Sequence, residues 1–270
     1  MASLTDRDVL VGRAYANPGP LEARKAIYRW QEPAVDLPAL AMAWLRDVTG
    51  LVVDVGCGTG QYLRRIAEDR PDLRVLGLDL SPGMHPHAIS DAQQLPLADG
   101  VAGAALAMHM LYHVPDIDRA IGELARALNP NGIAIVATNG QGHMRQFRDL
   151  FADAVHAAEP AAVTGRPGTR SAVGHRFRLE NGPAMLRNHF ASVEPEAWQS
   201  DIRIPDAADV LAYLDSTRAG REDSLPPGVS WDAMLDAARA IIDRIIARDG
   251  AFIAGSHSGV IICRGPRTRS

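Results

Sequence analysis

The residues best suited to chemistry lie in one short stretch near position 50. Residues 52–55 (Val-Val-Asp-Val) predict a buried strand, and residues 56–60 (Gly-Cys-Gly-Thr-Gly) follow it as a glycine-rich loop. A helix is expected from Gln61 onward, so its unpaired N–H groups and the positive end of its dipole face the loop. Glycines also let the backbone approach a ligand closely. This stretch therefore predicts a binding site for a polar, nucleoside-type ligand.

A second acidic residue supports this site. Residues 74–81 predict another strand that ends at Asp79, about 20 residues beyond the glycines, the spacing at which a carboxylate can bind ribose hydroxyls. An acid at such a position often caps a helix. Here Ser81 and Pro82 supply the helix start as N-cap and first-turn proline. Asp79 is therefore the strongest single-residue candidate for ligand binding.

Spacing separates three glycine-loop chemistries. A dinucleotide fingerprint needs a third glycine at Gln61 or Leu63, depending on the frame, and neither position has one. A phosphate-binding P-loop needs a lysine, and the only lysine of the chain is the distant Lys25. The remaining pattern, acid-x-Gly-x-Gly-x-Gly after a strand, resembles motif I of the class I S-adenosylmethionine (SAM)-dependent methyltransferases over residues 54–60.

The resemblance implies a set of SAM-binding residues. Residues 90–99 resemble a third family motif, in which Asp91 would accept from the adenine amino group and the Ala92 N–H would donate to the ring. Met84 lies where the family places an apolar residue against adenine. The full cofactor-binding set expected from the resemblance is Tyr15, Asp54, Gly56, Cys57, Gly58, Gly60, Asp79, Leu80, Met84, Asp91, Ala92 and Met108.

The segment 109–116 (His-Met-Leu-Tyr-His-Val-Pro-Asp) follows an expected strand at 102–108. It resembles the Leu-His-His-Leu-Pro-Asp stretch of small-molecule methyltransferases related to the ubiquinone and menaquinone C-methyltransferases, with Tyr112 in place of the first histidine. The same strand carries Gly103 where an aspartate is common. His109 and His113 are candidate general bases, since histidine titrates near neutral pH. Tyr28 is a candidate to orient the acceptor.

The elements that position these residues alternate regularly between strand and helix from 51 to 139, which predicts a parallel sheet. The expected fold is α/β, a Rossmann-like seven-stranded, mostly parallel sheet with helices on both faces. Residues 1–50 are expected to form an N-terminal helical lid and 51–140 the SAM-binding core. Residues 141–270 are expected to complete the sheet and, through 141–192 and 205–230, to help build an acceptor pocket.

Composition restricts the partners. The 270 residues include 47% hydrophobic side chains, enough for one large α/β domain with insertions. A net charge of −4 and a pI near 6.1 favour a small-molecule substrate over nucleic acid. Cys57 and Cys263 form neither a disulfide framework nor a metal site. We expect a cytoplasmic monomer or homodimer with no metal and no membrane segment.

The sequence thus predicts a methyltransferase that acts on a small, aromatic metabolite, with C-methylation of an electron-rich phenol or indole favoured. Methylation of oxygen or nitrogen stays open as an alternative. A nicotinamide-dependent oxidoreductase and a non-catalytic SAM-binding protein are two further alternatives. Abundant alanine and arginine with a single lysine are typical of high-GC bacteria. Such hosts often use these enzymes for natural product biosynthesis.

Overall fold

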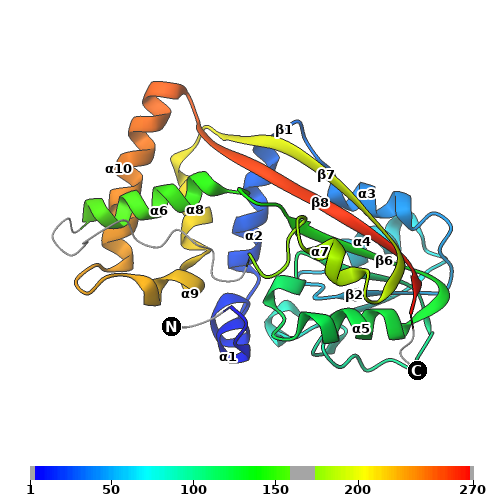
Figure 1. The fold of residues 1–270 in the computed structure, drawn as a ribbon. Helices are drawn as coiled ribbons and strands as arrows, with labels where there is room; N and C mark the ends of the chain where they lie inside the picture. Colours follow the sequence, from blue (N-terminus) through cyan, green and yellow to red (C-terminus); the bar gives the residue numbers. More distant parts are fainter. Residues whose placement is uncertain (1–3, 159–173, 268–270) are drawn as a thin grey trace. The chain divides into compact units, whose positions relative to one another are not determined.

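A computed structural model describes residues 4–158 and 174–267 (Figure 1). The chain forms two compact units. Unit 1 consists of the described parts of Met1–Val35, Gly142–Ala172 and Gln199–His257. Unit 2 consists of Asp36–Gln141 and the described parts of Val173–Trp198 and Ser258–Ser270. Most of residues 160–175, within the stretch 141–192 that is expected to help build an acceptor pocket, lies outside the described residues.

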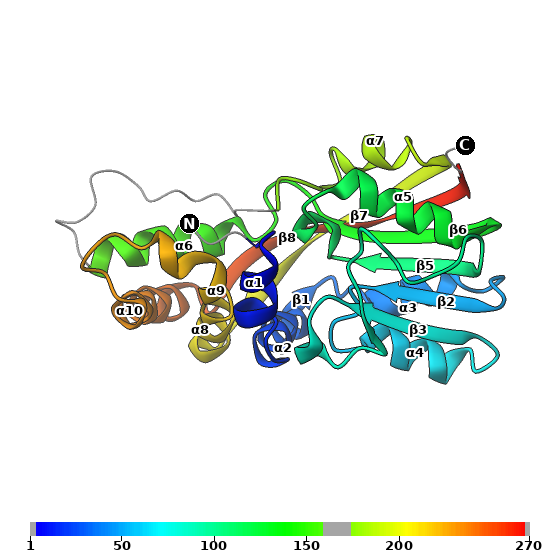
Figure 2. The same ribbon diagram turned by 90° about the horizontal axis from the view of Figure 1, so that it is seen from below.

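Unit 2 contains the parallel sheet predicted from the alternation of elements. Figure 2 shows the strands β3, β2, β5 and β6 side by side in this unit. They pair in parallel, and β8 runs antiparallel to β6. The strands are β2 (Leu51–Val55), β3 (Arg74–Asp79), β4 (Ala88–Ile89), β5 (Ala102–Met108), β6 (Leu128–Asn139), β7 (Phe190–Ile204) and β8 (Phe252–Pro266). Residues 199–204 of β7 and 252–257 of β8 belong to unit 1.

Alternate residues of these strands face two different hydrophobic cores. Val53 and Val55 of β2 belong to one core together with α5 (Ile117–Ala127) and α7 (Gly182–Leu186). Val52 belongs to the other core with α4 (Gln61–Asp69) and, by partly buried side chains, α3 (Leu37–Trp44). Helices therefore cover both faces of the sheet.

The strand order is β1-β7-β8-β6-β5-β2-β3-β4. From β2 the chain continues outward through β3 and β4, and it then returns to the other side of β2 as β5. The order therefore reverses at β2, and ligands of open α/β sheets bind at the carboxyl ends of strands beside such a reversal. The glycine loop begins where β2 ends.

Unit 1 is mainly helical and has its own core. Phe147, Phe151, Leu214 and Trp231 are among its buried members. Its elements are α1 (Arg7–Val9), a π-helical turn (Leu10–Ala14), α2 (Gly19–Ala26), a 3-10 helix (Ile27–Trp30), β1 (Gln31–Glu32), α6 (Arg145–Ala158), α8 (Ala207–Asp215), α9 (Arg218–Arg221), a 3-10 helix (Glu222–Ser224) and α10 (Trp231–Asp249).

The predicted fold class is confirmed, with small differences. The sheet has eight strands because β1 and β4 add two residues each. Residues 129–132 lie inside β6, where the register against β5 shifts. Residue 50 lies within unit 2, where Leu45 and Trp44 pack in the core beneath β2, and the helical lid expected over residues 1–50 stays a prediction. Within the described residues, no helix is long and apolar enough to cross a membrane.

Candidate active site

The glycine loop turns sharply where β2 ends. Gly56, Gly58 and Gly60 have φ angles of 70°, 51° and 73°, a region that other residues rarely adopt. The N–H groups of Gly56 and Cys57 donate to the Leu78 carbonyl at 2.7 and 3.0 Å, which fastens the loop to β3. A Cβ atom at Gly56 would lie 2.8 Å from the Met110 Cβ. Both the positive φ angle and the close contact with Met110 therefore require glycine at position 56.

Asp79 ends β3 beside this loop. Its Oδ2 accepts a hydrogen bond from the Gly58 N–H at 2.9 Å, and its Oδ1 accepts one from the Ser81 N–H at 2.9 Å. Burial raises the pKa of the Asp79 carboxyl above its usual value, and these backbone donors partly offset the rise. The two bonds hold the carboxylate in a fixed orientation at the end of its strand.

Asp54 is the most unusual charged group in this region. It is 0% exposed on β2, and neither carboxylate oxygen has a hydrogen-bond partner in the described part of the chain. Burial, followed by the negative charge of Asp79, raises the pKa of Asp54 to about 7. A buried carboxylate without a hydrogen-bond donor lowers the stability of the folded protein. A positively charged ligand would supply the missing partner.

Asp91 lies close to Asp79. Asp79 pairs with Ile89 across β3 and β4, and the Ser90 N–H donates to the Asp79 carbonyl at 2.8 Å. The Asp91 Oδ1 accepts from the backbone N–H of Gln93 at 2.8 Å and from its side-chain amide at 3.0 Å. The Asp91 carboxylate therefore belongs to a short turn at the same edge of the sheet as Asp79.

The apolar residues predicted for the cofactor site are largely shielded from solvent. Ala92, Met84, Cys57 and Met108 are buried, and Leu80 is half-buried. Met110 is an addition that sequence reasoning missed, since only the tertiary fold places its side chain against Gly56.

His109 and His113 follow β5 in unit 2. His109 has a φ of 56°, and its N–H donates to the Ala137 carbonyl of β6 at 3.0 Å. Burial lowers the pKa of His109 to about 4, so its imidazole is neutral near pH 7. His113 ends the 3-10 helix Leu111–His113, and its ring centroid lies 4.7 Å from that of Tyr112.

Arg176 holds the loop that carries these histidines, and sequence reasoning did not find it. Its guanidinium donates to the carbonyls of Val114 at 2.6 Å, Pro115 at 2.6 Å and Tyr112 at 3.3 Å. No motif marks this arginine, because its partners are backbone carbonyls more than 60 positions away in the chain.

Tyr15 and Tyr28 lie in unit 1. The Tyr28 hydroxyl is 3.4 Å from the His143 Nε2, and burial together with the neighbouring Tyr213 raises the pKa of Tyr28 above its usual value. The Tyr15 ring lies beneath Arg24, whose Cζ is 5.1 Å from the ring centroid. The roles of these tyrosines toward cofactor and acceptor stay predictions.

Comparisons with known proteins decide the family. Residues 53–136 match the family described as a methyltransferase domain. Over 219 residues, the chain is 30% identical to a malonyl-[acyl-carrier protein] O-methyltransferase of Geobacter sulfurreducens, in a match that covers 74% of this chain and 78% of that protein. The chain belongs to the class I SAM-dependent methyltransferases. This methyltransferase accordingly uses SAM as its cofactor.

Two further relatives show the breadth of the likeness. A demethylmenaquinone methyltransferase of Thermus thermophilus is 32% identical over 122 residues, which are 40% of this methyltransferase and 53% of that protein. The solved structure of a phosphoethanolamine N-methyltransferase 2 of Haemonchus contortus with SAM has a TM-score of 0.55 at 17% identity. That match covers 99% of this methyltransferase and 61% of that chain, and it bears on the fold alone.

The residues present fit SAM. Its α-ammonium and sulfonium groups are cations, and the buried Asp54 carboxylate has no partner of its own in the described residues. Its ribose carries hydroxyl donors, and Asp79 is an oriented acceptor beside the glycine loop. The predicted methyltransferase activity is confirmed at the level of the family by the matching domain and the methyltransferase relatives.

Proposed function

We propose that this methyltransferase binds SAM along the glycine loop and transfers the methyl group to the oxygen of an acidic small molecule or of a carrier-bound acid. Within this proposal Asp79 binds the ribose, Asp91 and Ala92 bind the adenine, and Asp54 lies toward the cationic end of SAM. One observation supports the proposed SAM site above all. Asp54 and Asp79 lie close to each other and to a loop with three glycines of positive φ.

The chemistry asks little of the protein beyond placement and proton transfer. Bound SAM supplies an activated methyl group on a positively charged sulfur. The protein must orient the acceptor atom and accept a proton where the acceptor carries one. His109 is neutral at pH 7 and can accept a proton, and with a pKa of about 4 it is a weak base. His113 is the alternative base, and Tyr28 is proposed to orient the acceptor.

A weak base favours an acceptor that is already ionised. A carboxylate oxygen has no proton to lose at neutral pH, whereas a phenol or indole must be activated by proton removal. Similarity to a malonyl-[acyl-carrier protein] O-methyltransferase over 78% of that protein supports the same choice. We therefore place a carboxylate acceptor first.

Ring-carbon methylation is the second candidate. It is supported by the segment 109–116, which resembles the quinone-pathway C-methyltransferases, and by similarity to a demethylmenaquinone methyltransferase. A role in natural product biosynthesis belongs with this candidate.

Thermal unfolding with SAM, S-adenosylhomocysteine, NADH or ATP tests the cofactor site, because a ligand that binds only the native state raises the unfolding temperature. We expect stabilisation by the first two alone. Methyl transfer from labelled SAM to malonate, malonyl thioesters, phenols and indoles then tests the acceptor. Transfer to the acids supports the first candidate, and transfer to the phenols or indoles alone supports the second. SAM binding with no transfer to any acceptor would favour a non-catalytic role.

The variant Asp79→Ala tests the placement of SAM. We expect its affinity for S-adenosylhomocysteine to fall about 10- to 100-fold, because bonds to a charged acceptor are worth ~1.5–3 kcal/mol. The control is Asp69→Ala, which removes an exposed carboxylate paired with Arg65 on α4. Equal affinity of both variants would refute the role of Asp79.

A further inference from the structure

Unit 1 contains a group of arginines around one tyrosine hydroxyl. Arg221, Arg24 and Arg148 are the charged side chains that act most strongly on Tyr213, and all are cations. Burial raises the pKa of Tyr213, and the three arginines act against that rise. They come from α9, α2 and α6, three segments far apart in sequence. The charged side chains that act on this hydroxyl are therefore all positive.

Arg148 donates to the His143 carbonyl at 2.6 Å. Neither Arg24 nor Arg221 has a counterion among the residues that the structure describes. The Nη2 of Arg24 is buried without a hydrogen-bond partner in the described residues, although its Nε donates to the Pro20 carbonyl at 3.2 Å. The Arg221 Cζ lies 4.8 Å from the ring centroid of Phe151. Burial lowers the pKa of Arg221, and the nearby Arg148 acts in the same direction.

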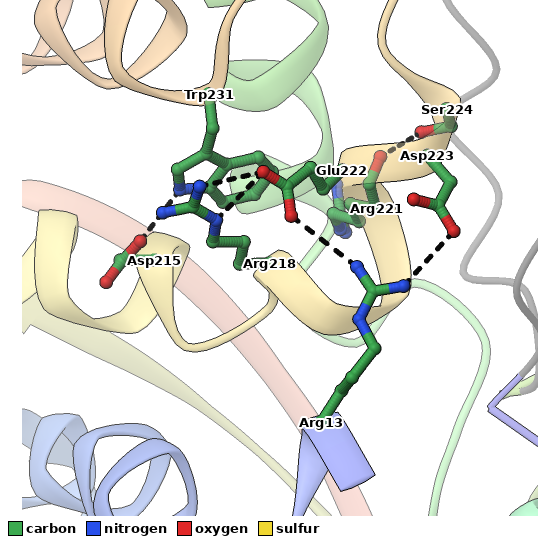
Figure 3. A network of polar contacts seen from close by, with 8 residues as sticks. All are labelled: Arg13, Asp215, Arg218, Arg221, Glu222, Asp223, Ser224 and Trp231. Carbon is green, nitrogen blue, oxygen red and sulfur yellow. Dashed lines mark hydrogen bonds and ion pairs between the residues drawn. The ribbon is translucent and has the colours of Figure 1, made fainter. Parts of the chain in front are cut away.

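The carboxylates next to Arg221 in sequence are directed elsewhere. Figure 3 shows Glu222 and Asp223 bonded to Arg13, at 3.5 and 3.3 Å, and Glu222 also to Arg218 at 2.8 Å. Among the residues that the structure describes, none accepts a hydrogen bond from the Arg221 guanidinium. The nearest acids in sequence therefore leave its charge uncompensated.

Burying cations without counterions lowers the stability of a protein. Such an arrangement becomes favourable when a ligand supplies the negative charge. The planar guanidinium matches the paired oxygens of carboxylate and phosphate groups, which it can bind through two parallel hydrogen bonds.

We propose that Arg24, Arg148 and Arg221 form a binding site in unit 1 for the carboxylate or phosphate group of a small organic anion. The Tyr213 hydroxyl adds a further donor, and Phe151 provides an apolar wall behind Arg221. The site is built only from residues of unit 1, whereas the glycine loop belongs to unit 2.

Calorimetric titration of the full chain with malonate, and separately with inorganic phosphate, tests this site at constant ionic strength. We expect saturable binding to the wild-type protein, and the anion that binds more tightly identifies the ligand as an organic acid or a phosphorylated compound. Arg221→Met and Arg24→Met should each weaken this binding about ten-fold or more, since each removes charge-assisted hydrogen bonds. The control is Arg145→Met, because the Arg145 side chain is 69% exposed on α6.

Absence of saturable binding by the wild-type protein with both anions would overturn the proposal. So would unchanged affinity in Arg221→Met. Unfolding of the variants in anion-free buffer separates a ligand site from a structural role: we expect Arg221→Met to be as stable as the wild-type protein or more so. A marked loss of stability there would assign Arg221 to the fold instead. Titration of the same samples with S-adenosylhomocysteine reports on SAM binding independently.

Discussion

Asp54 and Asp79 are neighbouring acids with opposite surroundings. Asp79 accepts hydrogen bonds from two backbone N–H groups, whereas Asp54 is fully buried and accepts none from the described residues. The fold therefore holds a carboxylate at Asp54 at the expense of its own stability. Such a group is better explained by ligand binding than by folding.

The variant Asp54→Asn is expected to be more stable than the wild-type protein above pH 7. The pKa of Asp54 is raised from 3.8 to about 7, so its contribution to stability is present below pH 4 and is lost as the pH rises through 7. Between pH 5 and 8 the wild-type protein should lose about 2–3 kcal/mol relative to the variant. Urea unfolding of both proteins at the two pH values measures this difference.

The same variant should bind SAM more weakly, because an amide cannot neutralise a cation. A stability difference that does not change between pH 5 and 8 would mean that Asp54 does not titrate in this range. Equal SAM affinity would remove Asp54 from the cofactor site.

His109 should produce the opposite pH dependence. Its pKa is lowered from 6.5 to about 4, so the folded state resists protonation, and stability is lost as the pH falls from about 6.5 toward 4. His109→Asn removes this loss, and asparagine tolerates the positive φ of 56° at this position. Relative to the variant, the wild-type protein should lose roughly 2 kcal/mol of unfolding free energy on going from pH 8 to pH 5.

Comparing each variant with the wild-type protein at both pH values isolates one group. In the His109 comparison the contribution of Asp54 is present in both proteins and cancels. A constant difference between wild type and His109→Asn would show that the imidazole is not shielded from solvent.

At the scale of elements, the loop after β5 is held from outside its own sequence. The Arg176 guanidinium donates hydrogen bonds to backbone carbonyls at the end of the 3-10 helix Leu111–His113. The helix has no such guanidinium donor of its own for these carbonyls. The conformation of this loop, which precedes β6 in the sequence, thus depends on a residue that follows β6. We regard Arg176 as a positioning residue for His109 and His113.

Arg176→Met should lower kcat for methyl transfer while the affinity for S-adenosylhomocysteine stays unchanged, since Arg176 contacts the histidine loop and not the glycine loop. It should also speed amide exchange at His113 and Val114, whose N–H groups donate to Met110 and Leu111 within the same turn. The control is Arg187→Met, at an exposed position. Unchanged exchange at both amides would exclude this role.

The start of β5 explains one departure from the family pattern. Gly103 stands where an aspartate is common, and a Cβ atom there would lie 2.2 Å from the Thr49 carbonyl oxygen. The chain before β2 therefore occupies the space that an aspartate side chain would need. The missing acid reflects local packing at the amino end of the strand, away from the glycine loop.

At the scale of the molecule, each unit is assembled from separate stretches of chain. The proposed SAM residues Asp54, Asp79 and Asp91 all belong to unit 2, whereas the proposed anion site belongs to unit 1. The two sets of residues do not overlap, so each proposal can be tested with its own variants of the intact protein.

Hydrogen exchange of the full chain should locate the two ligands. S-adenosylhomocysteine is expected to slow exchange at residues 56–60 and 77–81, by about ten-fold or more at saturating ligand. Malonate should slow exchange in α2 and α9. NADH serves as the control ligand and should change neither region. Protection by S-adenosylhomocysteine confined to unit 1 would contradict the proposed SAM site at the glycine loop.

Much of unit 2 could be predicted from the sequence because its signals are local. The strand at 51–55, the glycine loop and Asp79 are recognisable from contiguous residues, since φ preference and apolar periodicity act over a few positions. The cofactor follows from the same local motifs. These features were determined by the sequence alone.

Other features depend on which distant residues the fold brings together. Arg176 reaches the histidine loop from more than 60 positions away, and Met110 packs on Gly56 from the end of another strand. Arg24, Arg148 and Arg221 look like ordinary surface arginines in the sequence. Burial and the pairing of charges are properties of the assembled fold. Only the tertiary structure therefore decided that these three arginines act on Tyr213, and that Asp54 has no partner among the described residues.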